Sequence, residues 1–337
     1  MTELIGMQSI QFETPPYIMS TGNIVGKKEG EGPLGKLFDV VGDDDLFGEE
    51  TWEAAESTMQ KNSALWAINS AKLTKEQIRY IFAGDLLGQA IATSFGLMDL
   101  NVPLFGLYGA CSTAGESLSL AAMTVAAGYA DYVLAVTSSH FASAEKEFRY
   151  PLEYGNQRPL AASWTVTGSA AFVVGTQKSN VKISGITTGK IIDFGIKDSM
   201  NMGAAMAPAA CDTIYQNFMD FNIQPEEYDK IVTGDLGYIG SDILIDLLKE
   251  KGFDITKQHM DCGKEIFDQD AQDTHAGGSG CGCSATTLSA YLLKELEEAR
   301  MNKILFVPTG ALLSTVSYNE GQSVPGIAHG VVIERSE

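Results

Sequence analysis

Residues 81–86 read Ile-Phe-Ala-Gly-Asp-Leu, and residues 231–236 repeat the pattern as Ile-Val-Thr-Gly-Asp-Leu, 150 positions later. Each copy is a short apolar run that ends in Gly-Asp. Such a run is typical of a buried strand that leads into a loop. A repeat at this separation in a chain of 337 residues predicts two related halves.

A second repeated pair occurs in the same order. The Cys-Ser pair at residues 111–112 is matched by a Cys-Ser pair at residues 283–284, and a stretch of small and apolar residues follows each. An apolar strand then begins at residue 133 in the first half and at residue 304 in the second, 22 and 21 positions after the cysteine. Three features in one order at similar intervals indicate an internal duplication.

The predicted fold is therefore α/β, with two pseudo-repeated halves, residues 1–177 and 178–337, packed as layered sheets and helices. Because strands alternate with helices, we expect mostly parallel, buried sheets. Two segments are expected to leave this pattern. Residues 26–50 are polar and acidic, and residues 148–159 carry aromatic and cationic groups suited to a ligand mouth or to a subunit contact.

Composition excludes several classes of function. The formal net charge of −20 works against binding nucleic acid or an anionic membrane surface. We expect no signal peptide and no transmembrane segment, and therefore a cytoplasmic protein with reduced thiols. The odd number of cysteines fits free thiols, and nothing completes a zinc site around Cys281 and Cys283.

The turn around Cys111 is the strongest candidate for chemistry. It follows a strand-like run at residues 104–108 and precedes a helix, for which Ser112 or Thr113 is the expected N-cap. A helix N-terminus favours a thiolate, so Cys111 is a candidate nucleophile. The alternative is a buried, inert cysteine, and the residues alone leave both open.

With these motifs in place, the chain resembles the thiolase superfamily, which includes the ketoacyl synthases. That resemblance implies an acyl-accepting Cys111 assisted by two polar residues from the second half. Aligned by eye, Asp235 stands at the family's histidine and Cys281 at its asparagine. An ionised aspartate repels a developing oxyanion and a thiol is a weak donor, so we expect a degenerate active site that binds a ligand. The alternative is a Cys111-dependent acyl transferase or ketoacyl synthase-like condensing enzyme.

A closer resemblance runs along the whole chain, to the stage V sporulation protein AD family of spore-forming bacteria. It rests on strings such as those at residues 32–39, 147–151, 206–210, 276–281 and 327–335. The resemblance implies binding of dipicolinic acid (pyridine-2,6-dicarboxylate) and a role in its uptake into the developing spore. It also implies membrane partners from the same sporulation operon and a location at the spore inner membrane through those partners. The resemblance to the thiolase superfamily, whose members are commonly dimeric through the first half, implies a homodimer.

A dianionic ligand requires hydrogen-bond donors and positive charge. No resident cofactor is expected, although Ca²⁺ can accompany dipicolinate. Most of the candidate side chains listed below also have an ordinary structural interpretation. The lysines and arginines are explained equally well as solvated surface groups, and the two aspartates as acceptors that hold loops through backbone N–H groups. The candidate ligand-binding residues are Cys111, His140, His329, Asp85, Asp235, Cys281, Arg149 and Lys190, with Arg158 and Lys197 as further cations.

Overall fold

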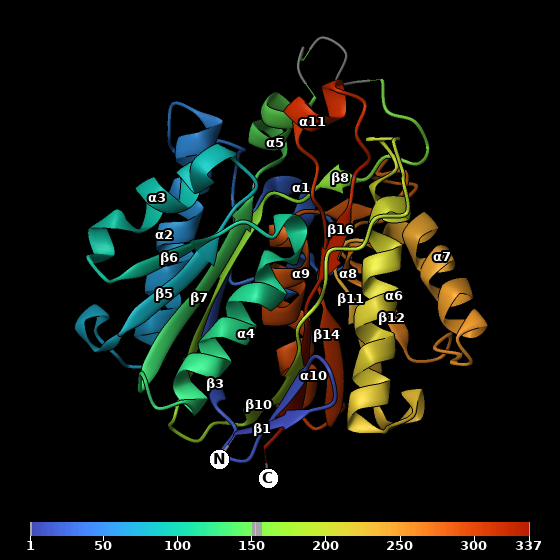
Figure 1. The fold of residues 1–337 in the computed structure, drawn as a ribbon. Coiled ribbons are helices and arrows are strands. Elements are labelled where there is room, and N and C mark those ends of the chain that lie inside the picture. Colours follow the sequence, from blue (N-terminus) through green and yellow to red (C-terminus); the bar gives the residue numbers. More distant parts are fainter. Residues whose placement is uncertain (1, 150–151, 153–156, 337) are drawn as a thin grey trace.

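The computed structural model describes residues 2–149, 152 and 157–336. Positions 150, 151 and 153–156 of the predicted excursion at 148–159 lie outside the described residues. One large sheet runs through both halves of the chain (Figure 1). Its first half has the strand order β3 (Tyr17–Val25), β9 (Gly168–Gly175), β7 (Tyr132–Ser139), β5 (Tyr80–Gly84) and β6 (Leu104–Leu107).

The second half repeats this order outward from the centre. It contains β10 (Val181–Thr187), β17 (Gly330–Arg335), β14 (Lys303–Val307), β11 (Lys230–Thr233) and β12 (His259–Asp261). The halves meet where β10 pairs with β3 in antiparallel register, with Val181 opposite Ile18. The repeat found in the sequence is thus a repeat of strand order, with β5 matching β11 and β7 matching β14.

The expectation of mostly parallel sheets is wrong. In each half the outer ladders are parallel, β5 with β6 and β7, and β11 with β12 and β14. The inner ladders are antiparallel, β9 with β3 and β7, and β17 with β10 and β14. The reason lies in two connecting segments, residues 140–167 after β7 and residues 308–329 after β14, which we call the excursions. Each excursion begins and ends at the same end of the sheet, so the strand that follows it, β9 or β17, runs antiparallel to the strand before it.

Helices separate and cover the two halves of the sheet. Figure 1 shows α4 (Thr113–Ala126) and α9 (Cys281–Thr287) between them, α2 (Trp52–Ser70) and α3 (Ile91–Leu97) outside the first half, and α6 (Met202–Phe221) and α7 (Gly237–Glu250) outside the second. A five-residue π-helical stretch, Leu288–Leu292, connects α9 to α10 (Leu293–Glu297). The largest buried side chains include Leu118 of α4, Phe172 of β9 and Phe306 of β14. They form the apolar core that fixes the helices against the sheet.

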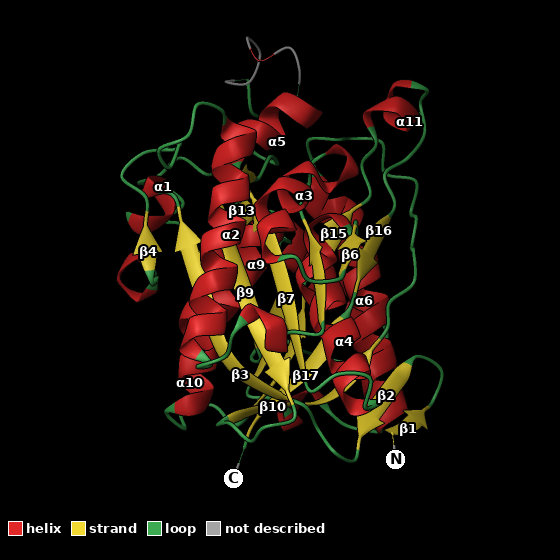
Figure 2. Cartoon of the chain, turned by 90° about the vertical axis from the view of Figure 1, so that its left-hand side faces the viewer, coloured by secondary structure: helices red, strands yellow, loops and turns green. Residues whose placement is uncertain are grey.

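The excursions form one end of the molecule. α5 (Phe141–Phe148) and β8 (Trp164–Thr165) follow β7, while β15 (Thr309–Ala311), α11 (Thr315–Asn319) and β16 (Gly326–Ala328) follow β14. Figures 1 and 2 both place α5 and α11 at the end opposite the two termini. β8 pairs with β13 (Gly278–Ser279), which precedes α9. The excursions thus bring both halves together beyond the carboxyl ends of β7 and β14.

The remaining strands and α-helices are short. They are β1 (Thr2–Ile5), β2 (Ser9–Phe12), α1 (Lys27–Gly30), β4 (Val40–Val41) and α8 (Cys262–Glu265). α1 and β4 lie in the segment at residues 26–50 that was expected to leave the repeat. Of the helices in the described part of the chain, none has the length and apolar character needed to cross a membrane.

Candidate functional site

A largely apolar cavity of about 170 Å³ lies where the two excursions meet the Cys111 turn. Residues from both halves line it: Leu86, Tyr108, Ala110, Cys111, Ala144, Phe148, Arg149 and Thr165 from the first, and Met202, Ser279, Ala311, Leu312, Leu313 and Ser314 from the second. Neither half alone can form this cavity. Its size matters because an engineered cavity of about 150 Å³ accommodates benzene.

The turn that carries Cys111 is strained and tightly packed. Ala110 has a left-handed backbone with φ +49°, which is unfavourable for a residue with a side chain. The turn leads through one 3-10 turn into α4. The expected N-cap contact is absent. The Ser112 and Thr113 hydroxyls instead donate to the carbonyls of Gly109 and Ala110, both at 2.7 Å. These side chains stabilise the turn and leave the N–H groups of α4 without a side-chain cap.

Cys111 is buried and holds its proton. Burial raises the pKa of its thiol well above the usual value, and the nearby carboxyl of Asp235 adds to the effect. The backbone N–H groups of Gly280 and of Cys111 itself, together with the charge of Arg149, lower the pKa but do not outweigh burial. A neutral thiol is a poor nucleophile. Of the two interpretations left open by the sequence, the electrostatics favour the inert cysteine.

Asp235 lies close to Cys111 but outside the cavity wall. The side chain is buried, and neither carboxyl oxygen makes a hydrogen bond of ordinary geometry. The N–H groups of Thr309 and Gly280 come nearest, yet burial and the charge of Asp261 raise the pKa of Asp235 well above its usual range. Burial therefore favours the neutral, protonated form of Asp235. In this form it does not repel an anion placed nearby.

Its counterpart in the first half, Asp85, has a different role. Asp85 Oδ1 accepts from the Leu87 N–H at 2.8 Å, and Oδ2 accepts from the N–H and the hydroxyl of Thr93 at 2.8 and 2.6 Å. This is the loop-tying role considered for both aspartates. In the second half Asp261 takes that role, accepting from the N–H groups of Leu236, Gly237 and Gly263. Asp235 therefore does not have the loop-tying role of Asp85.

Cys281 begins α9 immediately behind the Cys111 turn. Its thiol is fully buried and donates to the Ala110 carbonyl at 3.0 Å. It packs with Cys111, Leu86 and Ala144 in one small apolar cluster. The structure therefore brings Cys111, Asp235 and Cys281 together, as the alignment by eye predicted, although only Cys111 lines the cavity.

Of the predicted cations, all of which lie in the described part of the chain, only Arg149 lines the cavity. Its side chain is 14% exposed and forms an ion pair with Glu145 of α5, whose side chain is 5% exposed. Lys190 lies elsewhere, paired with Asp212 at 3.3 Å, and Arg158 pairs with Asp273 at 2.9 Å. Lys197 is exposed.

The two histidines expected near the cysteine are engaged in other contacts. His140 caps α5: its Nδ1 accepts from the Ala142 N–H at 3.1 Å, and its Nε2 lies 2.7 Å from the Asp45 carbonyl. Burial lowers the pKa of His140. His329 Nδ1 accepts from the Gly189 N–H at 3.3 Å, and burial lowers its pKa to about 4. Neither residue lines the cavity, and neither is positioned there as a base for Cys111.

Several cavity residues escaped the sequence analysis. Tyr108 lies three residues before Cys111, and its hydroxyl donates to the Leu86 carbonyl at 2.8 Å. Thr165 and Ser279 join the cavity wall because β8 and β13 pair side by side, an arrangement with no local sequence signal. Phe148 and Arg149 fall in the excursion that had been singled out as a ligand mouth.

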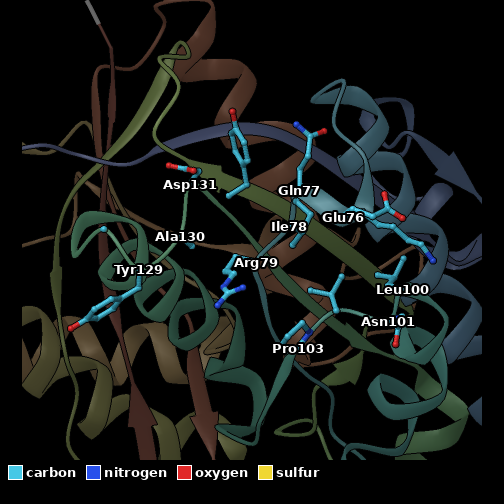
Figure 3. Close-up of a pocket in the computed structure, with 14 residues that line it drawn as sticks. Glu76, Gln77, Ile78, Arg79, Leu100, Asn101, Pro103, Tyr129, Ala130 and Asp131 are labelled. Atoms are coloured by element: carbon cyan, nitrogen blue, oxygen red, sulfur yellow. The ribbon is translucent and has the colours of Figure 1, made fainter.

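A larger depression of about 720 Å³ lies at the amino ends of β5, β6 and β7 (Figure 3). It is shallow and polar, with Arg79, Asn101, Tyr129 and Asp131 around it. None of the predicted site residues lies in it. Ligands of open α/β sheets usually bind at the carboxyl ends of the strands, so the smaller cavity at Cys111 is the candidate site. Across the described residues, no group of three or more His, Cys, Asp or Glu side chains is arranged to hold a metal ion.

Comparison with known proteins agrees with the geometry. By structure the chain is similar to 3-oxoacyl-(acyl-carrier-protein) synthase III of Aquifex aeolicus, with 14% identity, a TM-score of 0.58, and coverage of 95% of this chain and 99% of that chain. A crystal structure of an OleA variant of Xanthomonas campestris gives 16% identity, a TM-score of 0.61, and coverage of 96% and 97%. These similarities establish the thiolase-like fold.

By sequence, the chain is 44% identical to stage V sporulation protein AD of Bacillus subtilis (strain 168) over 334 residues, which is 99% of this chain and 98% of that protein. The family model for stage V sporulation protein AD matches residues 6–334. The chain belongs to the stage V sporulation protein AD family.

Proposed function

We propose that the chain binds dipicolinic acid in the cavity at Cys111 and acts in dipicolinate uptake into the developing spore. The observation that carries the proposal is a guanidinium, that of Arg149, in the wall of a cavity sized for one aromatic ring. Apolar walls accept the faces of a planar ring, and a guanidinium matches the geometry of a carboxylate. Thr165, Ser279 and Ser314, which carry hydroxyl groups, also line the cavity.

The environment of Asp235 supports an anionic ligand. Burial raises the pKa of Asp235 well above its usual range, which reduces the negative charge near Cys111. A Ca²⁺ ion accompanying the ligand would add positive charge, and the ligand's own oxygens would supply part of its coordination. The partners proposed are membrane proteins of the same sporulation operon, which would hold the chain at the spore inner membrane.

Acyl transfer through Cys111 is the alternative. It needs a thiolate and a base, whereas Cys111 is protonated and both nearby candidate histidines are engaged in backbone contacts. Incubation with an acyl-CoA followed by intact mass measurement separates the two functions. A stable acyl adduct on Cys111 would support the enzyme and count against a pure binder.

Calorimetric titration with dipicolinate, with and without Ca²⁺, tests the binding proposal directly. Arg149→Gln removes the cavity's guanidinium, and Lys190→Gln is a matched control at an exposed cation outside the cavity. A charge-assisted hydrogen bond contributes about 1.5–3 kcal/mol, so Arg149→Gln should weaken binding roughly 10-fold to 150-fold. Lys190→Gln should leave it unchanged. No heat of binding in any condition would reject the proposal.

A homodimer is proposed through β6, which ends the strand order and exposes apolar side chains. Phe105 is 53% exposed and Leu104 is 40% exposed. An apolar edge strand is a template for pairing with a second chain. Sedimentation analysis should show a dimer that Phe105→Glu converts to a monomer, and a monomeric wild type would refute this arrangement.

A further inference from the structure

The ion pair between Arg149 and Glu145 has an unusual arrangement. Glu145 lies one helical turn before Arg149 on α5, and its Oε1 accepts from Arg149 Nη1. Glu145 does not line the cavity, whereas Arg149 does. Among the residues that the structure describes, Arg149 Nε and Glu145 Oε2 have no hydrogen-bond partner, although both atoms are buried. Each member of the pair is therefore only partly satisfied.

A partly satisfied buried ion pair is a poor arrangement for stability. Buried ions are stabilised only when good geometry and further hydrogen bonds offset the loss of water. A guanidinium binds a carboxylate best through two parallel N–H groups, and the Nε edge of Arg149 is unused. Because the Nε atom is buried, a ligand carboxylate in the cavity could use that edge only after the side chain turns, and it would meet Glu145 already on Nη1.

We propose that Glu145 is an internal competitor of the ligand. It occupies Arg149 while the cavity is empty, and a ligand carboxylate must take the guanidinium over. This inference rests on the proposed function and concerns the same cavity. Glu145 thus sets a threshold for binding, because the ligand must attract Arg149 more strongly than Glu145 does. This threshold favours ligands that make additional contacts in the cavity, for example through a second carboxylate.

The displaced carboxylate has a second cation within its electrostatic reach. Burial raises the pKa of Glu145, and the charges of Arg149 and Arg158 both oppose that shift and favour the ionised form. Arg158 is held by Asp273 and lies over the ring of Trp164, with 4.8 Å from its guanidinium carbon to the ring centroid. Release of Glu145 from Arg149 therefore does not leave it without a neighbouring positive charge.

Glu145→Gln tests the inference, because it keeps the size of the side chain and removes its charge. Glu147→Gln is the matched control, two positions further along the helix at an exposed residue, with the same change in net charge. Calorimetry with dipicolinate and with the monocarboxylate pyridine-2-carboxylate should show Glu145→Gln tightening both by about tenfold or more. The monocarboxylate should gain at least as much as dipicolinate. Glu147→Gln should change either affinity less than twofold.

A double variant separates competition from a general change in the helix. In an Arg149→Gln background, Glu145→Gln should have no further effect, because there is no guanidinium to release. Circular dichroism and thermal unfolding identify any variant that has not folded. If Glu145→Gln does not fold, Glu145→Asp replaces it. The shorter aspartate should hold Arg149 less well, so this variant protein should bind the ligand more tightly than the wild type.

The outcomes distinguish this inference from the proposed function. If the wild type binds and folded Glu145→Gln binds equally or more weakly, the competitor role is overturned and the proposed function stands. If only Glu145→Gln binds, the competitor role is supported and the proposed function of the wild type is overturned. If neither binds either probe, both are overturned.

Discussion

Asp235 and Asp85 occupy matching positions of the two halves, and replacing each with asparagine should change stability in opposite directions. Asp235 is buried without an ordinary hydrogen bond, whereas Asp85 accepts three. The folded protein raises the pKa of Asp235 well above its usual range. Above about pH 4 the unfolded chain ionises this group while the folded protein keeps it protonated. The wild type therefore loses stability from this residue as the pH rises.

The size of the effect follows from linkage. Each pH unit between the unfolded and the folded pKa costs up to about 1.4 kcal/mol of unfolding free energy. An asparagine side chain cannot ionise, so the Asp235→Asn variant should match the wild type near pH 4 and become progressively more stable above it. Other buried acids, such as Glu56 with a pKa raised to about 8, contribute to the slope of both proteins and cancel in the difference.

The control variant reverses the sign. Asparagine has one acceptor oxygen, so Asp85→Asn must leave at least one of the Leu87 and Thr93 donors without a partner. This should lower the unfolding free energy by about 1–3 kcal/mol at neutral pH. Urea unfolding followed by circular dichroism, at half-unit steps from pH 4 to pH 8, measures all three proteins. The reasoning fails if the gap between Asp235→Asn and the wild type is independent of pH, or if both variants are destabilised alike.

Three further predictions concern the same turn and its support. Cys111 should react with iodoacetamide far more slowly at pH 7 than an exposed thiol, as followed by peptide mass spectrometry, because its thiol is protonated and buried; alkylation at the rate of a small-molecule thiol would contradict this. Gly310→Ala should disrupt the cysteine turn, because a Cβ there would lie 2.3 Å from the Gly109 carbonyl oxygen; an unchanged melting temperature and unchanged dipicolinate binding would show that the turn can adjust. Leu118→Ala should lower the unfolding free energy by about 2–5 kcal/mol, since Leu118 is completely buried, and a change below 1 kcal/mol in urea unfolding would place it outside the rigid core.

The duplication was visible in the sequence because strands, turns and helices leave periodic, local signals. Strand direction was not. β9 and β17 run antiparallel to β7 and β14 because each excursion begins and ends at the same end of the sheet. No short sequence pattern distinguishes such a connection from a crossover helix. The N-cap assignment failed for a related reason. Ser112 is suited to capping, but its hydroxyl bonds backward into the turn.

The candidate site was predicted in part. The alignment placed Asp235 and Cys281 beside Cys111, and the structure agrees. It could not separate Asp85 from Asp235, because two copies of Gly-Asp look identical until their hydrogen-bond partners are known. Thr165 and Ser279 enter the cavity only through the pairing of β8 with β13, which is a property of the folded chain.

The cavity is lined by two parts of the chain that differ in burial: a floor in the interior and a roof formed by the excursions. Its floor belongs to the interior, where Cys111 packs with Leu86 and with Cys281, the first residue of α9. Its roof is carried by the excursions, and α11 beside it exposes Val316 to 68%. A protein that binds the roof can therefore alter entry to the cavity without disturbing the sheet. Substitutions in the floor, in contrast, change how firmly the whole chain folds.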